Sequence, residues 1–155
     1  MIACTYGGTE NRIVMTLVQQ RQETGKSNLI AFLCPPELRE YYKEDPLNAN
    51  SKDAEIALIA NFIWNLDELA QLNKKEISEL KGILSRRVIK QRRAYARDEE
   101  NSRRIVNFWG STNKEEFLTD SENTRWLCFR VTNINHDSLL NKETFLFGFL
   151  FSLSN

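Results

Sequence analysis

The tetrapeptide Thr24-Gly25-Lys26-Ser27 is the part of the sequence best suited to chemistry on a phosphate group. A phosphate-binding loop places backbone N–H groups around phosphate oxygens, a lysine over the β and γ phosphates, and a hydroxyl on Mg²⁺. Strand, Gly-Lys-Ser and helix supply these groups in the required order. The full pattern G-x-x-x-x-G-K-[ST] would need a glycine where the chain has Gln20. That turn usually requires a positive φ, so we expect Gln20 to lower the affinity for a nucleotide, and the tripeptide alone is weak evidence.

Two further groups of polar residues follow apolar runs. Asp67 and Glu68 come directly after residues 62–66, and Ser111-Thr112-Asn113 follow residues 105–109. Parallel strands bring such strand ends to one edge of a sheet, where ligands bind. There, one carboxylate would hold Mg²⁺, the next would polarise an attacking water, and the amide of Asn113 would either bind the γ-phosphate or orient that water. Each group alone could be an ordinary turn, but three together with Gly-Lys-Ser favour a phosphoryl-transfer site.

A basic segment separates these two groups. Residues 86–104 contain eight Lys or Arg side chains against three acids. Cations bind nucleic-acid phosphates and an aromatic ring stacks on a base, so the segment is a candidate contact with single- or double-stranded DNA. The alternative is a solvated charged arm. The DNA-binding candidates are Lys90, Arg92, Arg93, Tyr95 and Arg97.

The elements that must position these residues alternate between strands and helices. Short apolar runs predict strands at residues 13–18, 62–66, 105–109 and 126–131. We expect helices over residues 29–33 and 52–60, a short helix and a loop within residues 37–50, and a hairpin arm over residues 88–95. The capping box formed by residues 73–76 predicts a helix to about residue 86. This order is typical of a three-layer α/β domain with a mostly parallel sheet.

The composition argues against several classes of protein. The chain has 155 residues, about one domain, with 21 basic and 21 acidic side chains, so any affinity for DNA must come from a local patch. Three cysteines without paired spacing and one histidine, His136, argue against a disulfide scaffold or structural zinc. The apolar residues 145–153 are too few to cross a bilayer, which takes about 20 in a helix. We expect a soluble, cytoplasmic protein without a membrane partner.

Residues 13–131 resemble the P-loop domain of the virulence-associated protein E family. The motifs are LVQQRQETGKS, FIWNLDELAQLNKKEISELKGIL, RRAYAR, FWGSTNKEEFLTD and TRWLCF, in that order. The family belongs among the AAA+ and superfamily-3-like helicases of phages, plasmids and genomic islands. The resemblance implies a P-loop NTPase that uses ATP and Mg²⁺ in the DNA replication of a mobile element. Intact relatives of this kind form rings, in which the insertion at residues 86–104 is a DNA-contacting hairpin.

The resemblance also implies roles for individual residues. Lys26 and Ser27 correspond to the ligands of the nucleotide and Mg²⁺, within the loop that begins at Thr24 and Gly25. Asp67 and Glu68 match the Walker B pair, with Asp67 near the metal and Glu68 as the general base. The last two correspondences are the sensor asparagine, Asn113, and an arginine that acts as a sensor or as a finger at a subunit interface, Arg125.

Two departures from the family pattern lead to alternatives. The first departure is Gln20. The second lies at the two ends of the chain, where only residues 1–12 precede the core of residues 13–131. Residues 132–155 end in an apolar segment that we expect to differ from the family, as in a copy that lacks the C-terminal part. The alternatives to a working ATPase are a catalytically inactive remnant and a DNA-binding module without turnover. Gln20 and the segment of residues 132–155 favour the inactive remnant. The basic segment of residues 86–104 favours the DNA-binding module.

Overall fold

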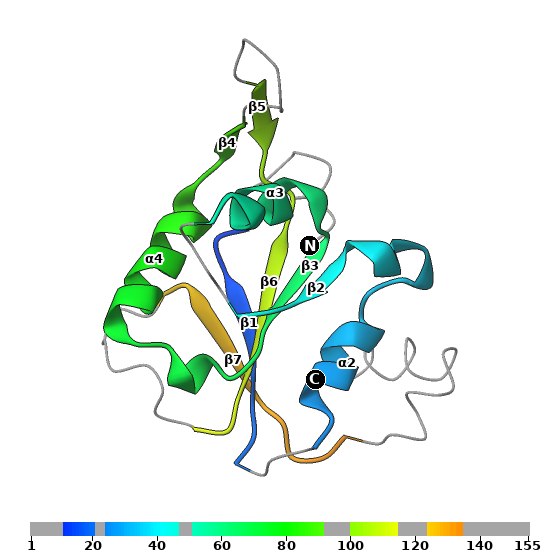
Figure 1. Cartoon of the computed structure of the whole chain (residues 1–155). Coiled ribbons are helices and arrows are strands. Elements are labelled where there is room, and N and C mark those ends of the chain that lie inside the picture. Colours follow the sequence, from blue (N-terminus) through cyan, green and yellow to red (C-terminus); the bar gives the residue numbers. More distant parts are fainter. Residues whose placement is uncertain (1–10, 21–23, 47–50, 92–99, 115–123, 135–155) are drawn as a thin grey trace.

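A computed structural model describes residues 11–20, 24–46, 51–91, 100–114 and 124–134 (Figure 1). A five-stranded sheet forms its centre. The strands are β1 (Val14–Val18), β2 (Tyr42–Glu44), β3 (Ile63–Leu66), β6 (Asn107–Thr112) and β7 (Trp126–Arg130). They lie in the order β2-β3-β6-β1-β7, and every neighbouring pair is parallel. The predicted α/β class with a mostly parallel sheet is confirmed.

Two details of the sheet differ from the sequence-based expectation. The three-residue strand β2 falls within the segment predicted to be helix and loop, where residues 36–41 form the 3₁₀ helix η1 (Pro36–Tyr41). So short a run carries too few residues to show a strand periodicity. Strand β6 begins at Asn107, two residues later than predicted, because the N–H groups of Ile105 and Val106 donate to the Leu58 carbonyl. It continues to Thr112 rather than ending near residue 109, since Gly110 and the two hydroxyl residues after it pair with β1. Asn113 is therefore the first residue after the strand.

Helices α3 and α4 begin where the sequence supplies a capping side chain. Helix α3 (Lys52–Ala60) starts at Ser51, whose side chain accepts a hydrogen bond from the Ala54 N–H. Helix α4 (Lys74–Ser85) starts at the predicted capping box, in which Asn73 and Glu76 each accept from the other's backbone N–H. Helix α2 (Lys26–Phe32) follows the Thr24-Gly25 turn, and the 3₁₀ helix η2 (Leu69–Gln71) follows the Asp67-Glu68 turn.

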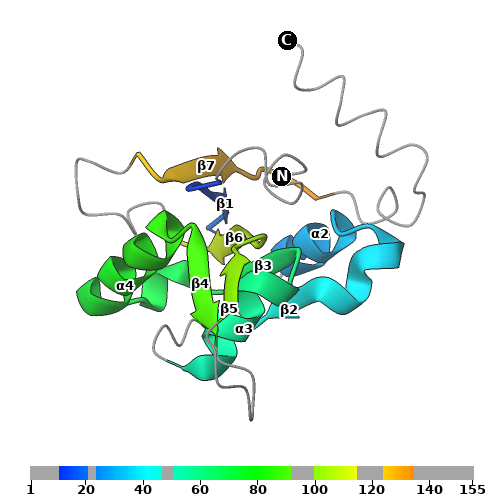
Figure 2. The same cartoon turned by 90° about the horizontal axis from the view of Figure 1, so that it is seen from above.

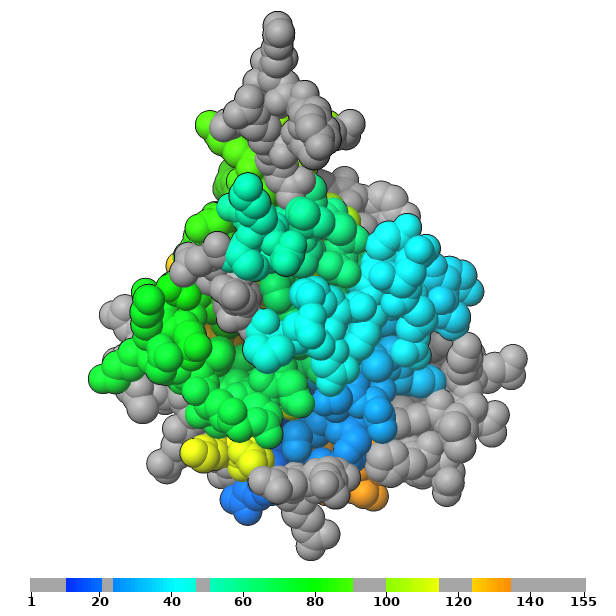
Figure 3. All heavy atoms as spheres, in the orientation of Figure 1, coloured from blue at the N-terminus to red at the C-terminus, as the bar shows by residue number. Residues whose placement is uncertain are grey.

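Apolar side chains cover both faces of the sheet. One core packs the even-numbered residues Val14, Trp64 and Phe108 against α3 and α4. The other packs Leu17, Ile63 and Trp109 with Ile30 of α2. Successive side chains of a strand point to opposite faces, so the molecule has the three layers that the sequence predicts. Figure 2 shows α4 and α2 on opposite sides of the central strands, and in Figure 3 the helices cover much of the visible surface.

A two-stranded antiparallel hairpin, β4 (Val88–Gln91) and β5 (Glu100–Arg103), follows α4 and projects from one end of the sheet (Figure 1). The side chain of Arg104 fixes its base. It is 6% exposed and donates to the carbonyl oxygens of Arg86 and Val106, each at 3.0 Å, and of Leu84 at 3.4 Å. Arg104 is therefore a structural anchor of the hairpin rather than part of its exposed basic surface.

The described helices include none long and apolar enough to cross a membrane.

Candidate functional site

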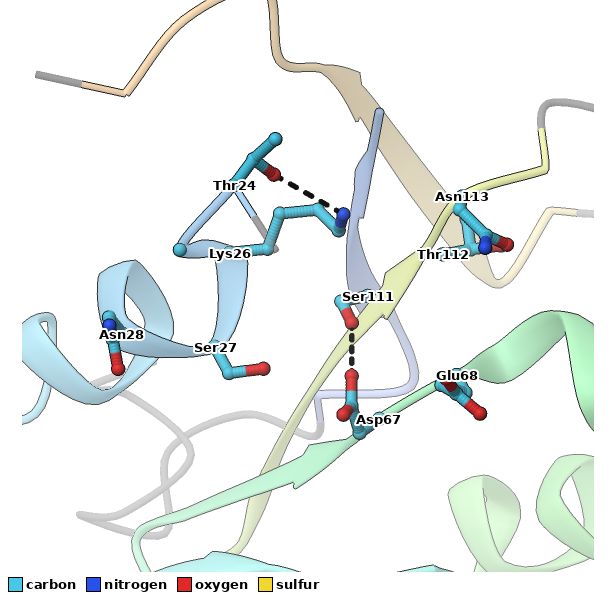
Figure 4. A pocket seen from close by; sticks show the side chains of 10 residues that line it. Thr24, Lys26, Ser27, Asn28, Asp67, Glu68, Ser111, Thr112 and Asn113 are labelled. Carbon is cyan, nitrogen blue, oxygen red and sulfur yellow. Dashed lines mark hydrogen bonds between the residues drawn. The ribbon is translucent and has the colours of Figure 1, made fainter. Parts of the chain in front are cut away.

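A cavity of about 520 Å³ opens where β1, β3 and β6 end (Figure 4). The strands are parallel, so their carboxyl ends meet at one edge of the sheet, as the sequence predicts. Three segments line the cavity: residues 24–28 after β1, residues 67–68 after β3, and residues 111–113 at the end of β6. The residues of these segments carry one ammonium group, two carboxylates, four hydroxyls and two amides. Such a set can hold a polyphosphate together with a divalent cation.

The turn at residues 24–27 has a backbone that only glycine adopts without strain. Gly25 has φ 81° and ψ 22°, and its carbonyl accepts from the Leu29 N–H at 2.9 Å, which opens α2. Lys26 is 9% exposed, and its Nζ donates to Thr24 Oγ1 at 3.4 Å. Within the described residues only Gly25 and Glu68 have a positive φ. Gln20 therefore does not adopt the left-handed backbone that its position led us to expect.

Asp67 lies across the cavity from this turn. Its Oδ1 accepts a hydrogen bond from the hydroxyl of Ser111 on β6, the strand that separates β1 from β3. Figure 4 shows the Asp67 carboxylate directed toward Ser111, with the Ser27 side chain facing the same space. Asp67 and Ser27 are therefore placed on opposite sides of one cavity, as a shared cation between them would require.

Glu68 adopts an unusual backbone beside Asp67. Its φ of 51° and ψ of 47° are left-handed, a conformation that costs a residue with a side chain about 1–3 kcal/mol and clusters at functional sites. The next residue, Leu69, is 1% exposed and packs over Gly110 of β6. A Cβ atom at Gly110 would lie 2.3 Å from Leu69 Cδ1 and 3.1 Å from the Leu66 carbonyl oxygen. Gly110 thus allows the turn at residues 67–69 to lie close to the sheet.

Asn113 and its neighbours complete the cavity at the end of β6. Thr112 is 2% exposed, and its Oγ1 accepts from the Lys114 N–H at 3.2 Å, which bends the chain directly after the strand. This bend presents the half-buried Asn113 side chain at the cavity wall. The structure thereby brings together all the predicted nucleotide-site residues that follow β1, β3 and β6.

Arg125 is at the other end of the sheet. It precedes β7, its carbonyl accepts from the Val14 N–H at 2.8 Å, and its guanidinium donates to the Lys81 carbonyl of α4. Val14 is the first residue of β1, and the four steps from it to Val18 at the cavity edge span about 13 Å at 3.3 Å per residue. Arg125 therefore does not reach the cavity of its own chain, and only the role at a subunit interface stays a prediction.

The predicted DNA-binding residues divide into two groups. Lys90 is exposed on β4, at the end of the molecule opposite to the cavity (Figure 1). The other four, Arg92, Arg93, Tyr95 and Arg97, lie outside the described residues.

Sequence reasoning missed three contributors to the site. Asn28 lines the cavity from the first turn of α2, Ser111 binds Asp67, and Gln71 Nε2 donates to Glu68 Oε2. Ser111 belongs to the predicted group Ser111-Thr112-Asn113. Its hydrogen bond to Asp67 joins β6 to the end of β3, so it could be predicted only with the strand order known. Gln71 is three residues after Glu68, a spacing at which side chains meet on a helical turn.

The described residues contain no group of three or more His, Cys, Asp or Glu side chains arranged to hold a metal ion.

Comparisons with known proteins agree with this geometry. Among solved structures, an apo structure of the NrS-1 C-terminal region has a TM-score of 0.62 at 19% identity, over 93% of this chain and 38% of that chain. The A form of that region has a TM-score of 0.58 at 18% identity, over 91% of this chain and 35% of that chain. These likenesses support the fold, and the chain spans little more than a third of those structures. A search of curated proteins found no match.

The family comparison covers most of the chain. The model of the virulence-associated protein E-like domain matches residues 4–150. The match includes the candidate site and extends beyond residues 13–131 on both sides, into most of the segment that we expected to differ from the family. The resemblance seen in the motifs is thereby confirmed: the chain belongs to the virulence-associated protein E-like domain family.

Proposed function

We propose that this chain is an ATP-binding P-loop NTPase domain of a primase- or helicase-like replication protein. The observation that supports it most is the cavity at the carboxyl edge of the sheet. Lys26, Asp67 and Asn113 reach it from the ends of three different strands. A lysine and a glycine turn suit phosphate oxygens, and the carboxylates suit a cation and an attacking water.

Mg²⁺ fits the donors present. In nucleotide sites this ion takes one or two carboxylates together with substrate phosphates. Asp67, already oriented by Ser111, and the hydroxyl of Ser27 provide such a donor set in one cavity. The ion would neutralise charge on the β- and γ-phosphate oxygens.

The protein residues would divide the hydrolysis between them. Lys26 would hold the phosphate charge, and Asn113 would orient a water in line with the γ-phosphorus. Glu68 would accept the proton of that water as its oxygen bonds to phosphorus and the bond to the ADP oxygen breaks. Phosphoryl transfer depends mostly on positioning and electrostatics, so an arginine brought by a neighbour could raise the rate by a factor of about 10³–10⁵. Arg125 of a second copy in a ring would be that arginine.

Family membership suggests the biological setting. A P-loop domain of this family would couple ATP hydrolysis to DNA during replication of a phage or genomic island, in the cytoplasm of the host. The hairpin β4–β5 offers the contact with DNA. An isolated copy would bind nucleotide and hydrolyse it slowly, since the arginine of a neighbour would be missing.

Replacement of Glu68 by Gln tests the hydrolytic role. The amide keeps the shape of the side chain but cannot accept a proton, so we expect Mg²⁺-ATP to bind with unchanged affinity. Phosphate release under single-turnover conditions should fall about 10²-fold or more. Equal rates for Glu68→Gln and the wild type would remove Glu68 from the reaction and leave ATP binding standing.

A DNA-binding module without turnover is the second candidate. The exposed side chains of Arg87, Lys90 and Arg103 lie on or beside β4 and β5, away from the cavity. Binding to DNA that falls steeply with salt and is indifferent to nucleotide would favour this function over the ATPase.

A further inference from the structure

Strand β7 forms one edge of the sheet. It is the last strand in the order β2-β3-β6-β1-β7, so within the described residues it pairs only with β1. Figure 2 shows β7 at the margin of the sheet, beside β1. The Val131 N–H donates to the Val18 carbonyl at 2.8 Å. Since the N–H groups of a strand alternate in direction, the Cys128 N–H is directed away from β1. Such an outer edge is a template for a further strand.

The side chains of β7 are exposed on both faces of the sheet. Leu127 and Phe129 are 46% and 37% exposed, and they stand beside Met15 and Leu17 on the face that packs on α2. Cys128 is exposed on the opposite face. We call Leu127, Cys128 and Phe129, with the outer edge of their strand, the β7 surface. It continues the core of the protein without being covered by any described element.

The other edge of the sheet differs in composition. Strand β2 is only three residues long and carries Lys43 and Glu44. Short length and charged side chains are the usual means by which an edge strand avoids further pairing. The β7 surface has neither, since its strand is five residues long and its three side chains are uncharged. The sequence of β7 therefore suits a strand with neighbours on both sides.

A segment of the same chain has the composition that the β7 surface requires. Residues 145–153, which lie outside the described residues, read FLFGFLFSL and contain no charge. Phenylalanine occupies every second position from Phe145 to Phe151, and Leu146 and Leu150 stand between. Successive side chains of a strand point to opposite faces, so as a strand this segment would be apolar on both faces. A neighbour of β7 has to be apolar in the same way.

The connection to this segment is short but sufficient. Residues 135–144 join it to Ile134, the last described residue after β7. Ten extended residues span about 33 Å, about twice the length of a five-residue strand. A short tether also keeps the local concentration of the segment in the millimolar range. The segment would therefore occupy the β7 surface in preference to a second copy of the chain at ordinary protein concentrations.

We propose that residues 145–153 pair with the outer edge of β7 as a sixth strand of the sheet, with their phenylalanines beside Leu127 and Phe129. The segment returns antiparallel to β7, because antiparallel neighbours need only a loop between them. The family match to residue 150 includes most of the segment. The proposal does not depend on nucleotide binding.

Hydrogen–deuterium exchange of the full chain, followed by mass spectrometry, tests the proposal. In the wild type, peptides from residues 126–130 and 145–153 should both exchange about tenfold or more slower than an unfolded chain. Phe149→Lys places a charge in the row of phenylalanines, so exchange of the β7 peptide should rise several-fold. Leu127→Lys should in turn speed up exchange of residues 145–153. Peptides of α4 should stay unchanged, which shows that both variants are folded.

Ser154→Lys is the matched control, because it adds the same charge to the chain just beyond the segment. It should leave both peptides at wild-type rates. Exchange of residues 145–153 as fast as an unfolded chain in the wild type would overturn the proposal. So would a β7 peptide that does not respond to Phe149→Lys. Protection that rises with protein concentration, together with a dimer in sedimentation, would overturn it in favour of a second copy. Neither readout involves ATP, so failure here leaves the proposed function standing.

Discussion

At the scale of single residues, the hydroxyl of Ser111 sets the direction of the Asp67 carboxylate. It donates to Asp67 Oδ1 from the neighbouring strand, with Ser111 itself 3% exposed. A buried donor on a rigid strand restricts the rotation of an exposed carboxylate, in the way that outer residues orient metal ligands. Asp67 would then meet a cation without first being ordered by it.

Replacement of Ser111 by Ala should therefore weaken the binding of Mg²⁺ in the presence of ATP. Outer residues of this kind typically contribute about tenfold to a hundredfold to metal affinity, and we expect the lower end because Asp67 itself remains. Titration of Mg²⁺ into the ATP-bound protein measures the change. Ser78→Ala, an exposed change on α4 away from the cavity, provides the control. Equal Mg²⁺ affinities for the two variants would show that Ser111 does not orient a metal ligand.

Single residues also show how far the sequence alone could lead. Lys26, Asp67 and Asn113 were predictable because each follows an apolar run, and parallel strand ends converge. The contact from Ser111 to Asp67 was not, because it requires β6 to lie directly beside β3. Arg125 was assigned by its motif, and the register of β7 with β1 places it at the far end of the sheet.

Gly110 controls a contact between elements. Its missing side chain admits Leu69 of η2 onto strand β6, beside the turn that carries Asp67 and Glu68. Leu69 is 1% exposed, so it has little room to withdraw from a new methyl group. The position of the acidic turn therefore depends on a glycine that lies on a different strand.

Gly110→Ala should lower the free energy of unfolding by about 1–3 kcal/mol, the usual cost of overpacking a core. Urea denaturation measures it. Gly82 on α4 is the matched control, because nothing lies within 4 Å of a Cβ atom there. Gly82→Ala should stabilise the protein by about 0.5–1 kcal/mol through its higher helix propensity. Equal effects of the two substitutions would contradict the packing of Leu69 on Gly110.

Elements with a local signal were predicted accurately. Helices α3 and α4 each begin at a residue whose side chain caps the first turn of the same helix. The start of each helix could therefore be predicted from a few neighbouring residues of the sequence. Strand β2 was missed, because its three residues are strand only through pairing with β3. The extension of β6 through Gly110 to Thr112 likewise depends on pairing with β1, which no local pattern reports.

The whole molecule separates its two candidate functions across the sheet. The cavity lined by residues 24–28, 67–68 and 111–113 lies at the carboxyl ends of the strands, and the hairpin projects from the other end (Figure 1). Helix α4 runs between the two regions. Two residues separate its start from η2, its 12 residues span about 18 Å, and two residues separate its end from β4. The buried guanidinium of Arg104 joins the end of α4 to the hairpin base.

If the hairpin binds DNA phosphates, Lys90→Ala should weaken binding and reduce the slope of log K against log salt by about one. The measurement is fluorescence anisotropy of a labelled oligonucleotide over a series of salt concentrations. Lys74→Ala removes the same charge from an exposed site at the start of α4 and should leave the slope unchanged. Equal slopes for both variants would exclude Lys90 from the DNA contact.

The central claim is that the cavity binds Mg²⁺-ATP through Lys26, and calorimetry of ATP with the wild type and Lys26→Ala tests it most directly. Removing the buried ammonium group should abolish saturable binding, while Lys74→Ala should bind like the wild type. Circular dichroism should show both variants folded. Saturable binding by the wild type that is lost only in Lys26→Ala is the predicted result. No binding by folded wild-type protein, or equal binding by Lys26→Ala, would contradict the account.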